Sequence, residues 1–219
     1  MCPSPQPLAA ACRLVADSES SSIRQLDLRT GGGRSVAGGD PLFAGNLFKA
    51  GDRDGSGAAL LGRGALLQHP MDVAVTTGGG RAFVADSFNH KVKGLDLDSG
   101  RVCTIAGTES SGWRDGDGTR AQFAEPGGLC ALPNGAVLVA DTNNHAVRVI
   151  SFPVRPWDSP GQTHCSVSTL ELNGIHKPCA GIVSNDHMGD AVSLHAGQLS
   201  VASEAAAAGD RCSDSTLYR

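Results

Sequence analysis

The stretch Val84-Ala85-Asp86-Ser87-Phe88-Asn89-His90-Lys91-Val92-Lys93 decides the fold, because versions of it occur three times in the chain. An earlier copy occupies residues 15–24 and a later copy residues 139–148. Each copy has an apolar run ending at Asp, a turn rich in Asn or Ser, and a β-branched residue followed by a cation. This order predicts strand, turn, strand, and its repetition predicts an architecture of tandem units.

A four-stranded unit can be drawn around the middle copy, with strands expected at 71–77, 81–86, 91–97 and 101–107. The third copy repeats it at 127–132, 136–141, 146–152 and 166–172, whereas the first offers only 12–17, 22–28 and 34–39. Tandem antiparallel units without helical periodicity predict an all-β fold, a partial β-propeller of about three blades. Because propellers close with roughly four to eight blades, we expect an open arc and a fragment of a longer protein.

The repeats divide the chain into regions. We expect an N-terminal remnant at 1–11, a propeller segment at 12–175 and a disordered low-complexity tail at 176–219. Within the propeller segment, the repeats occupy about 12–39, 67–107 and 121–174. The stretches between them, 40–66 and 108–120, are longer than blade connections require and are interpreted as insertions.

Composition excludes several classes of function. A net charge of −4 leaves no basic surplus for a nucleic-acid backbone. No apolar run reaches the roughly 18 residues of a transmembrane helix. The seven cysteines form no Cys-x-x-Cys and have no zinc-site spacing, so we interpret them as small hydrophobic residues and expect no cofactor.

The motif Val-Ala-Asp-Ser/Thr-x-Asn-His-x-Val-Lys/Arg at 84–93 and 139–148 resembles the NHL repeat. The first copy carries Ser20-Ser21 in place of Asn-His. Gly38-Gly39-Asp40-Pro41 and Leu67-Gln68-His69-Pro70 are similar to the C-terminal propeller of the thioredoxin-like/NHL proteins, and other details are closer to the plant and algal branch. The resemblance implies further blades and a thioredoxin-like domain in the parent protein, a chloroplast thylakoid location and a role related to photoprotection.

The three repeated carboxylates, Asp17, Asp86 and Asp141, stand at a strand end before a turn, so we expect them to cap those turns. Asp52-Arg53-Asp54-Gly55 and Asp115-Gly116-Asp117-Gly118 resemble the start of a calcium-binding loop. Loop position twelve would be Arg63 or Pro126, where calcium requires an acid. We therefore interpret both stretches as turns.

In an up-and-down blade, the insertions and the Asn-His turns emerge on the same face. We expect this face to bind a protein partner, because an exposed aromatic beside an arginine is typical of interfaces. Its expected members are Phe43, Phe48, Asp52, Asp54, His90, Trp113, Arg114, Asp115, Asp117 and His145.

Two functions stay open on these grounds. The first is a non-catalytic protein-interaction scaffold. The alternative is a metal-dependent propeller enzyme of the NHL lyase type, which a repeated histidine on the inner strands would favour, whereas His90 and His145 lie in turns further out. Their repetition in equivalent turns favours a structural role for both.

Overall fold

The computed structural model describes residues 12–39, 50–56, 64–153, 164–171, 191–195 and 198–202. Within these ranges the chain is almost entirely antiparallel β-sheet, and its two 3₁₀ segments are single turns. None of the described helices is long and apolar enough to cross a membrane. The predicted all-β fold is confirmed.

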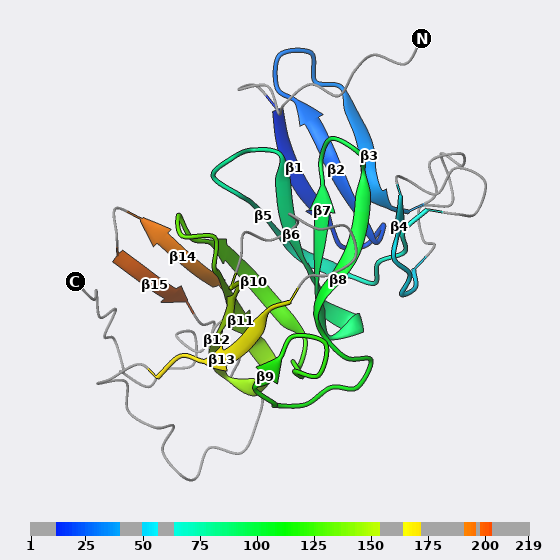
Figure 1. Ribbon diagram of the computed structural model, residues 1–219. Helices are drawn as coiled ribbons and strands as arrows, with labels where there is room; N and C mark the ends of the chain where they lie inside the picture. Colours follow the sequence, from blue (N-terminus) through cyan, green and yellow to red (C-terminus); the bar gives the residue numbers. More distant parts are fainter. Residues whose placement is uncertain are drawn as a thin grey trace, which may run out of the picture.

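Three consecutive sheets form an open arc (Figure 1). The first blade has three strands, β1 (Cys12–Asp17), β2 (Ser22–Asp27) and β3 (Gly33–Gly38). The second contains β5 (Pro70–Val75), β6 (Arg81–Asp86), β7 (Lys91–Asp96) and β8 (Arg101–Gly107). The third contains β10 (Pro126–Ala131), β11 (Val137–Asp141), β12 (Ala146–Ser151) and β13 (Ser166–Thr169).

The stretches interpreted as insertions add a fifth strand to the blade that follows them. Strand β4 (Gly55–Ser56) pairs with β8, and β9 (Gly116–Asp117) pairs with β13. We call residues 51–56 and 112–117 the arms of blades two and three. Both arms share the sequence Gly-x-Arg-Asp-Gly. Their described parts are therefore edge strands with a repeated sequence, and not the free loops that the sequence suggested.

Successive blades pack through apolar side chains on their facing surfaces. Between blades one and two, Ile23 packs with Val84, Leu95 and Leu67. Between blades two and three, the buried set is Phe83, Val92, Ile105, Phe123, Val137, Val139 and Ile150. Strand β6 contributes to both interfaces, which explains its uninterrupted apolar run. The apolar residues of β2 and β7 do not alternate strictly, because a register shift follows Ile23 and Val92, and β7 is in addition packed on both faces.

The hydroxyl that follows each repeated Asp joins one blade to the next. Ser18 Oγ donates to Pro70 O at 2.8 Å, and Ser87 Oγ donates to Pro126 O at 2.6 Å. The equivalent Thr142 Oγ1 is buried and has no hydrogen-bond partner among the described residues. Blade three therefore presents the same donor toward the position that a next blade would take.

A hairpin of β14 (Ala191–His195) and β15 (Gln198–Ala202) lies within the region expected to lack order. Strand β14 packs beside β10, as β10 packs beside β5 (Figure 1). The hairpin thus occupies the place of the first strands of a further blade. The other residues of 176–219 lie outside the described part of the chain.

The four cysteines in the described ranges, Cys12, Cys103, Cys130 and Cys165, are free. Burial raises the pKa of Cys103 and of Cys165 to about 11. The Cys165 thiol donates to Ile105 O at 3.3 Å. The interpretation of Cys103 and Cys130 as strand residues is consistent with their positions in β8 and β10.

Gly118 should tolerate no side chain. Its N–H donates to Cys165 O and its carbonyl accepts from Gly107 N, both at 2.9 Å, so it lies between blades two and three. An added Cβ would overlap Cys165 Sγ. We expect Gly118→Ala to lower the free energy of unfolding by about 1–3 kcal/mol, measured by urea denaturation. Gly78→Ala is the matched control, because nothing lies within 4 Å of its added Cβ. Equal losses from both variants would contradict this account.

Candidate functional site: carboxylate clasps beneath the Asn-His turns

The Asn-His turn is a single 3₁₀ turn closed by a left-handed histidine. Segment η2 (Ser87–Asn89) is followed by His90 with φ of 55°, and η3 (Thr142–Asn144) by His145 with φ of 51°. The His90 N–H donates to Ser87 O at 3.0 Å, and His145 repeats this bond with Thr142. Both histidines therefore have a structural role in ending the turn.

The expectation that the repeated aspartates cap their turns requires correction. No side-chain bond from Asp86 or Asp141 caps the turn that follows. Asp86 Oδ1 accepts Gln68 N at 2.7 Å, and Asp141 Oδ1 accepts Ala124 N at 2.7 Å. Both carboxylates are fully buried under the turn. There they bind the segment that leads into the first strand of the blade. Only Asp17 accepts a turn N–H, from Ser20 at 3.4 Å.

The asparagine of each turn connects the buried carboxylate to the arm. Asn89 Nδ2 donates to Asp86 Oδ2 at 2.8 Å and to Gly51 O at 2.9 Å. Asn144 Nδ2 makes the same bonds, at 2.8 Å to Asp141 Oδ2 and 2.9 Å to Gly112 O. The amide thus anchors the beginning of the arm, which explains why both arm-bearing blades have Asn here.

A fully buried cation lies beneath each of these turns. In blade two, Lys93 Nζ contacts Asp52 at 2.5 Å, Asp54 at 3.2 Å and Asp86 at 3.7 Å. Its side chain is 0% exposed. Lys91 also forms an ion pair with Asp52. Two carboxylates from the arm and one from the blade therefore surround one ammonium group.

Blade three repeats the arrangement with a guanidinium group. Arg148, also 0% exposed, contacts Asp115 and Asp141 at 2.6 Å each. It donates further bonds to Gln122 O at 3.0 Å and Arg114 O at 2.9 Å, and lies 5.2 Å from the Phe123 ring centroid. The planar, multidentate group satisfies four acceptors at once.

The arm carboxylate also binds the outer strand of the blade. Asp54 accepts Thr104 N at 2.8 Å and Thr104 Oγ1 at 3.0 Å. Asp115 accepts Thr169 N at 3.0 Å and Thr169 Oγ1 at 3.1 Å. We call each set a clasp: Asp54, Asp86, Asn89, Lys93 and Thr104 in blade two, and Asp115, Asp141, Asn144, Arg148 and Thr169 in blade three.

Within the clasps, burial and neighbouring charges shift the pKa of each ionisable group in opposite directions. Burial raises the pKa of Asp86 to about 6, against the opposing effect of Asn89, Gln68 N–H and Lys93. Burial also raises the pKa of Asp141. For Asp52, burial is outweighed by Lys91 and Lys93, which hold its pKa below the usual range. The surrounding carboxylates likewise outweigh burial at Lys93 and raise its pKa.

The residues expected on the partner-binding face do not all have the same structural role. Asp52, Asp54 and Asp115 belong to the ion-pair networks described above, whereas Asp117 Oδ1 accepts Thr119 N at 3.2 Å within a turn. Phe43 and Phe48 lie outside the described residues.

His90 Nδ1 accepts Glu125 N at 3.2 Å. Trp113 is 61% exposed, although its Nε1 donates to Thr169 Oγ1 at 3.0 Å. The backbone of Arg114 exchanges bonds with Gln122. In the described ranges, no three His, Cys, Asp or Glu side chains gather as a metal ion would require.

Blades built around Asn-His turns define this chain as a segment of an NHL-repeat β-propeller, and the NHL repeat model matches residues 123–150. Among named proteins, the chain is similar to Protein SUPPRESSOR OF QUENCHING 1, chloroplastic, of Arabidopsis thaliana, with 48% identity over 164 residues, or 75% of this chain. It is 41% identical over 149 residues, or 66% of this chain, to NHL repeat-containing protein 2 of Homo sapiens. The chain spans only 14% of the first relative and 19% of the second. Neither name states a catalytic activity.

Two solved structures have the same fold at low identity. A candidate gluconolactonase matches with a TM-score of 0.53 and 15% identity, over 88% of this chain and 53% of that one. A protein of unknown function from Bacteroides thetaiotaomicron matches with a TM-score of 0.50 and 19% identity, over 73% of this chain and 32% of that one. These likenesses concern the fold alone.

Removing one buried cation should destabilise the chain strongly. Lys93→Met leaves the carboxylates of Asp52 and Asp86 without their shared partner, and breaking a buried ion pair in this way costs about 3–5 kcal/mol. Urea denaturation measures the loss. Arg101→Met changes an exposed cation on the adjacent strand and should cost less than about 0.5 kcal/mol. A loss of under about 1 kcal/mol for Lys93→Met would show that the clasp contributes little.

Asp86 should also affect how stability depends on pH. Because its pKa rises from 3.8 to about 6 on folding, its stabilising contribution is complete below 3.8 and is lost as pH rises through about 6. In Asp86→Asn there is no such group, so this loss of stability with rising pH is absent. The free energy of unfolding should therefore increase more steeply with pH between 3.8 and about 6 than in the wild type. Urea titrations at several pH values measure the slope, and an unchanged slope would refute the assignment.

Proposed function

We propose that this segment is the protein-binding surface of a larger, non-catalytic NHL scaffold linked to a thioredoxin-like domain. Its working face bears the Asn-His turns and the arms. The observation that carries the proposal is an exposed aromatic ring held on a fixed piece of backbone. A pre-ordered aromatic anchor loses little conformational entropy on binding, and such anchors are frequent energetic centres of interfaces.

Trp113 is that anchor, because the backbone on both sides of it is fixed. Gly112 O accepts from Asn144, and Asp115 binds Arg148 and Thr169. The indole itself is tied to Thr169, yet 61% of the residue is exposed. The clasp of blade three therefore presents an apolar surface to solvent without the mobility of a loop.

Phe88 is a second exposed aromatic residue on the side of the Asn-His turns, and the sequence analysis did not identify it. It stands in the turn immediately before Asn89 and is 48% exposed. Its ring stacks on His69 with centroids 4.4 Å apart. The two exposed aromatic residues belong to different parts of their blades, Phe88 to the Asn-His turn of blade two and Trp113 to the arm of blade three.

The likeness to the chloroplastic relative supports a chloroplast location, and we propose the thylakoid and photoprotection as the setting. That relative is named as a suppressor of quenching. A polypeptide with a thioredoxin-like domain would couple the redox state of that domain to the partner held by the propeller. This part of the proposal rests on resemblance, whereas the binding face rests on geometry.

Trp113→Ala combined with Arg114→Ala should weaken partner binding by about 2 kcal/mol or more in the full-length protein that contains this segment. Truncating both side chains removes the exposed ring and an adjacent directed donor. Quantitative affinity capture from chloroplast extract, followed by calorimetric titration of the captured partner, measures the effect. Circular dichroism checks that the fold is retained.

Ser99→Ala combined with Asn134→Asp provides the matched control. Both residues lie in the strand-connecting turns at the opposite ends of the strands from the Asn-His turns. Binding should stay within about twofold of the wild type, as expected for changes outside an interface. Equal losses from the two pairs would place the binding surface elsewhere.

A further inference from the structure

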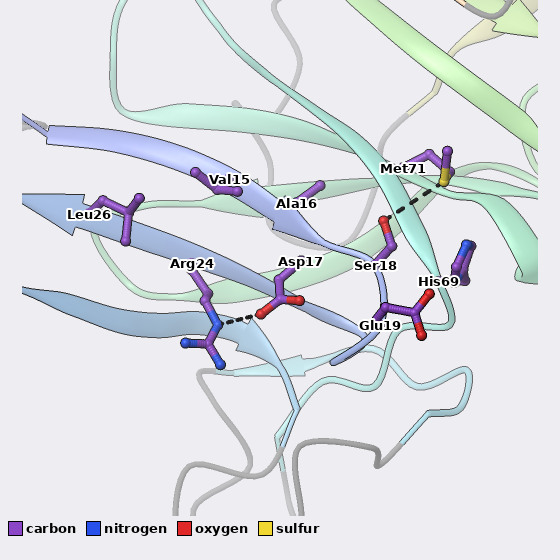
Figure 2. Close-up of a pocket in the computed structure, with 9 residues that line it drawn as sticks. All are labelled: Val15, Ala16, Asp17, Ser18, Glu19, Arg24, Leu26, His69 and Met71. Carbon is purple, nitrogen blue, oxygen red and sulfur yellow. Dashed lines mark hydrogen bonds and ion pairs between the residues drawn. The ribbon is translucent and has the colours of Figure 1, made fainter. Parts of the chain in front are cut away.

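The residue that leads into each of blades two and three has a strained backbone. His69 has a φ of 51° and Glu125 a φ of 50°, and each directly precedes the proline that begins the first strand of its blade. Left-handed backbone is unfavourable for a residue with a Cβ atom, so contacts must hold both residues in this conformation. Figure 2 shows His69 at the turn of blade one, where it lines a pocket with Ser18 and Glu19.

One of these contacts is a hydrogen bond from the strained residue to the turn of the preceding blade. His69 N donates to Ser21 Oγ at 3.3 Å, and Glu125 N donates to His90 Nδ1 at 3.2 Å. Ser21 and His90 hold the same place in their turns, because both have positive φ and both N–H groups bond to the residue three positions earlier. The two joints between blades are therefore built alike and differ in the accepting side chain.

The two acceptors respond differently to acid. A serine hydroxyl keeps its lone pairs at every pH of interest, whereas the imidazole Nδ1 accepts a hydrogen bond only while it carries no proton. Histidine is the side chain that ordinarily changes charge between about pH 5 and pH 8. Once His90 is protonated, two N–H groups point at each other across the joint, and the bond to Glu125 is lost.

The neighbouring bonds confine this loss to the entry of blade three. Ala124 N donates to Asp141 Oδ1 at 2.7 Å, and Ser87 Oγ donates to Pro126 O at 2.6 Å. Neither bond uses the His90 side chain, so both can persist when His90 is protonated. The residue released is Glu125, whose strained backbone is then free to relax.

We propose that His90 makes the joint between blades two and three acid-sensitive on the face of the Asn-His turns. In acid, protonation of Nδ1 releases Glu125 and loosens the segment that leads into blade three. The joint between blades one and two keeps its bond, because Ser21 does not titrate. The chain thus contains one responsive joint and one that resists acid.

Other ionisable groups stand on the described segments that pack around His90. They are Asp86 and Lys91 of its own turn and strands, Asp52 of the arm, His69 and Asp72 at the start of the blade, and Glu125. Lys91 and Asp52 form an ion pair. Burial raises the pKa of Asp72, and raises that of Asp86 to about 6. Because Asp86 changes charge in the same range, the free energy of unfolding does not isolate His90, and the measurement must be local.

Amide hydrogen exchange followed by NMR in the intact 219-residue chain provides this local measurement. Each rate is divided by the intrinsic rate of the same amide at the same pH, which gives a protection factor. We expect the protection factor of the Glu125 amide to fall about tenfold between about pH 8 and pH 5, as loss of one hydrogen bond implies. That of the His69 amide should change less than about twofold, since Ser21 holds it. This comparison needs no variant.

His90→Asn separates the histidine from the other ionisable groups. Asparagine tolerates left-handed backbone, and its Oδ1 lies as many bonds from the backbone as Nδ1 and accepts at every pH. The protection factor of Glu125 in this variant should be the same at both pH values. The proposal would be overturned by constant protection of Glu125 in the wild type, or by equal falls at Glu125 and His69. A fall that persists in His90→Asn would also overturn it, by assigning the response to another group such as Asp86.

Discussion

The pairing of one buried cation with carboxylates from two different segments organises each complete blade. Lys93 and Arg148 are fully buried, and burying either group alone would cost several kcal/mol. Each pairs with a carboxylate of its own blade, Asp86 or Asp141, and the arm adds a second carboxylate, Asp54 or Asp115, when it runs along the outer strand. The arm carboxylate therefore couples the arm to the strand pair and to the outer strand, which lie about 30 to 50 residues further along the chain. A blade whose arm is displaced would keep its internal ion pair and lose the arm carboxylate together with the bonds of that carboxylate to the outer strand.

This requirement makes the blades depend on one another. Each arm precedes its blade in sequence and leaves from the previous blade, so the connection is part of the structure on both sides. Ser18 and Ser87 add a direct bond to the next blade, and Gly118 lies at the contact between blades two and three. The faces at the two ends of the arc then differ in kind. In blade one, the described residues provide Arg24 with the carboxylate of Asp17 alone, and in blade three the buried Thr142 hydroxyl has no partner among those residues. The clasp of blade three also fixes the backbone around Trp113. The ion pairs inside the blade therefore contribute to the proposed binding surface.

Local patterns were sufficient for much of the architecture. The threefold repeat around Asp17, Asp86 and Asp141 predicted the strand pairs and the all-β arc, because an apolar run, an Asx-rich turn and a β-branched pair act over short sequence distances. The role of those aspartates was wrong in two copies, since a carboxylate before a turn can cap it or point beneath it. The orientation of Asp86 and Asp141 depends on the N–H groups of Gln68 and Ala124, which lie 18 and 17 residues earlier in the chain. The stretches that contain the arms were interpreted as insertions because they are longer than blade connections require, and their Asp-Gly sequences were interpreted as turns. The repeated Gly-x-Arg-Asp-Gly was the signal that could have identified them.

By itself, the sequence determined the strands around the three Asp-containing turns, the number of blades they form and the residues that recur in each, because these depend on periodicity and turn chemistry within about ten residues. It did not determine which acid pairs with which cation. Asp52 and Asp54 meet Lys93 across about 40 positions, and only the pairing of β4 with β8 brings them within ion-pair distance. The tertiary structure likewise decided that, among the described residues, Arg24 pairs with one carboxylate where Lys93 and Arg148 pair with two or more. Electrostatic compensation of a buried charge depends on distance in space, and that distance exists only once the arm and the outer strand have paired.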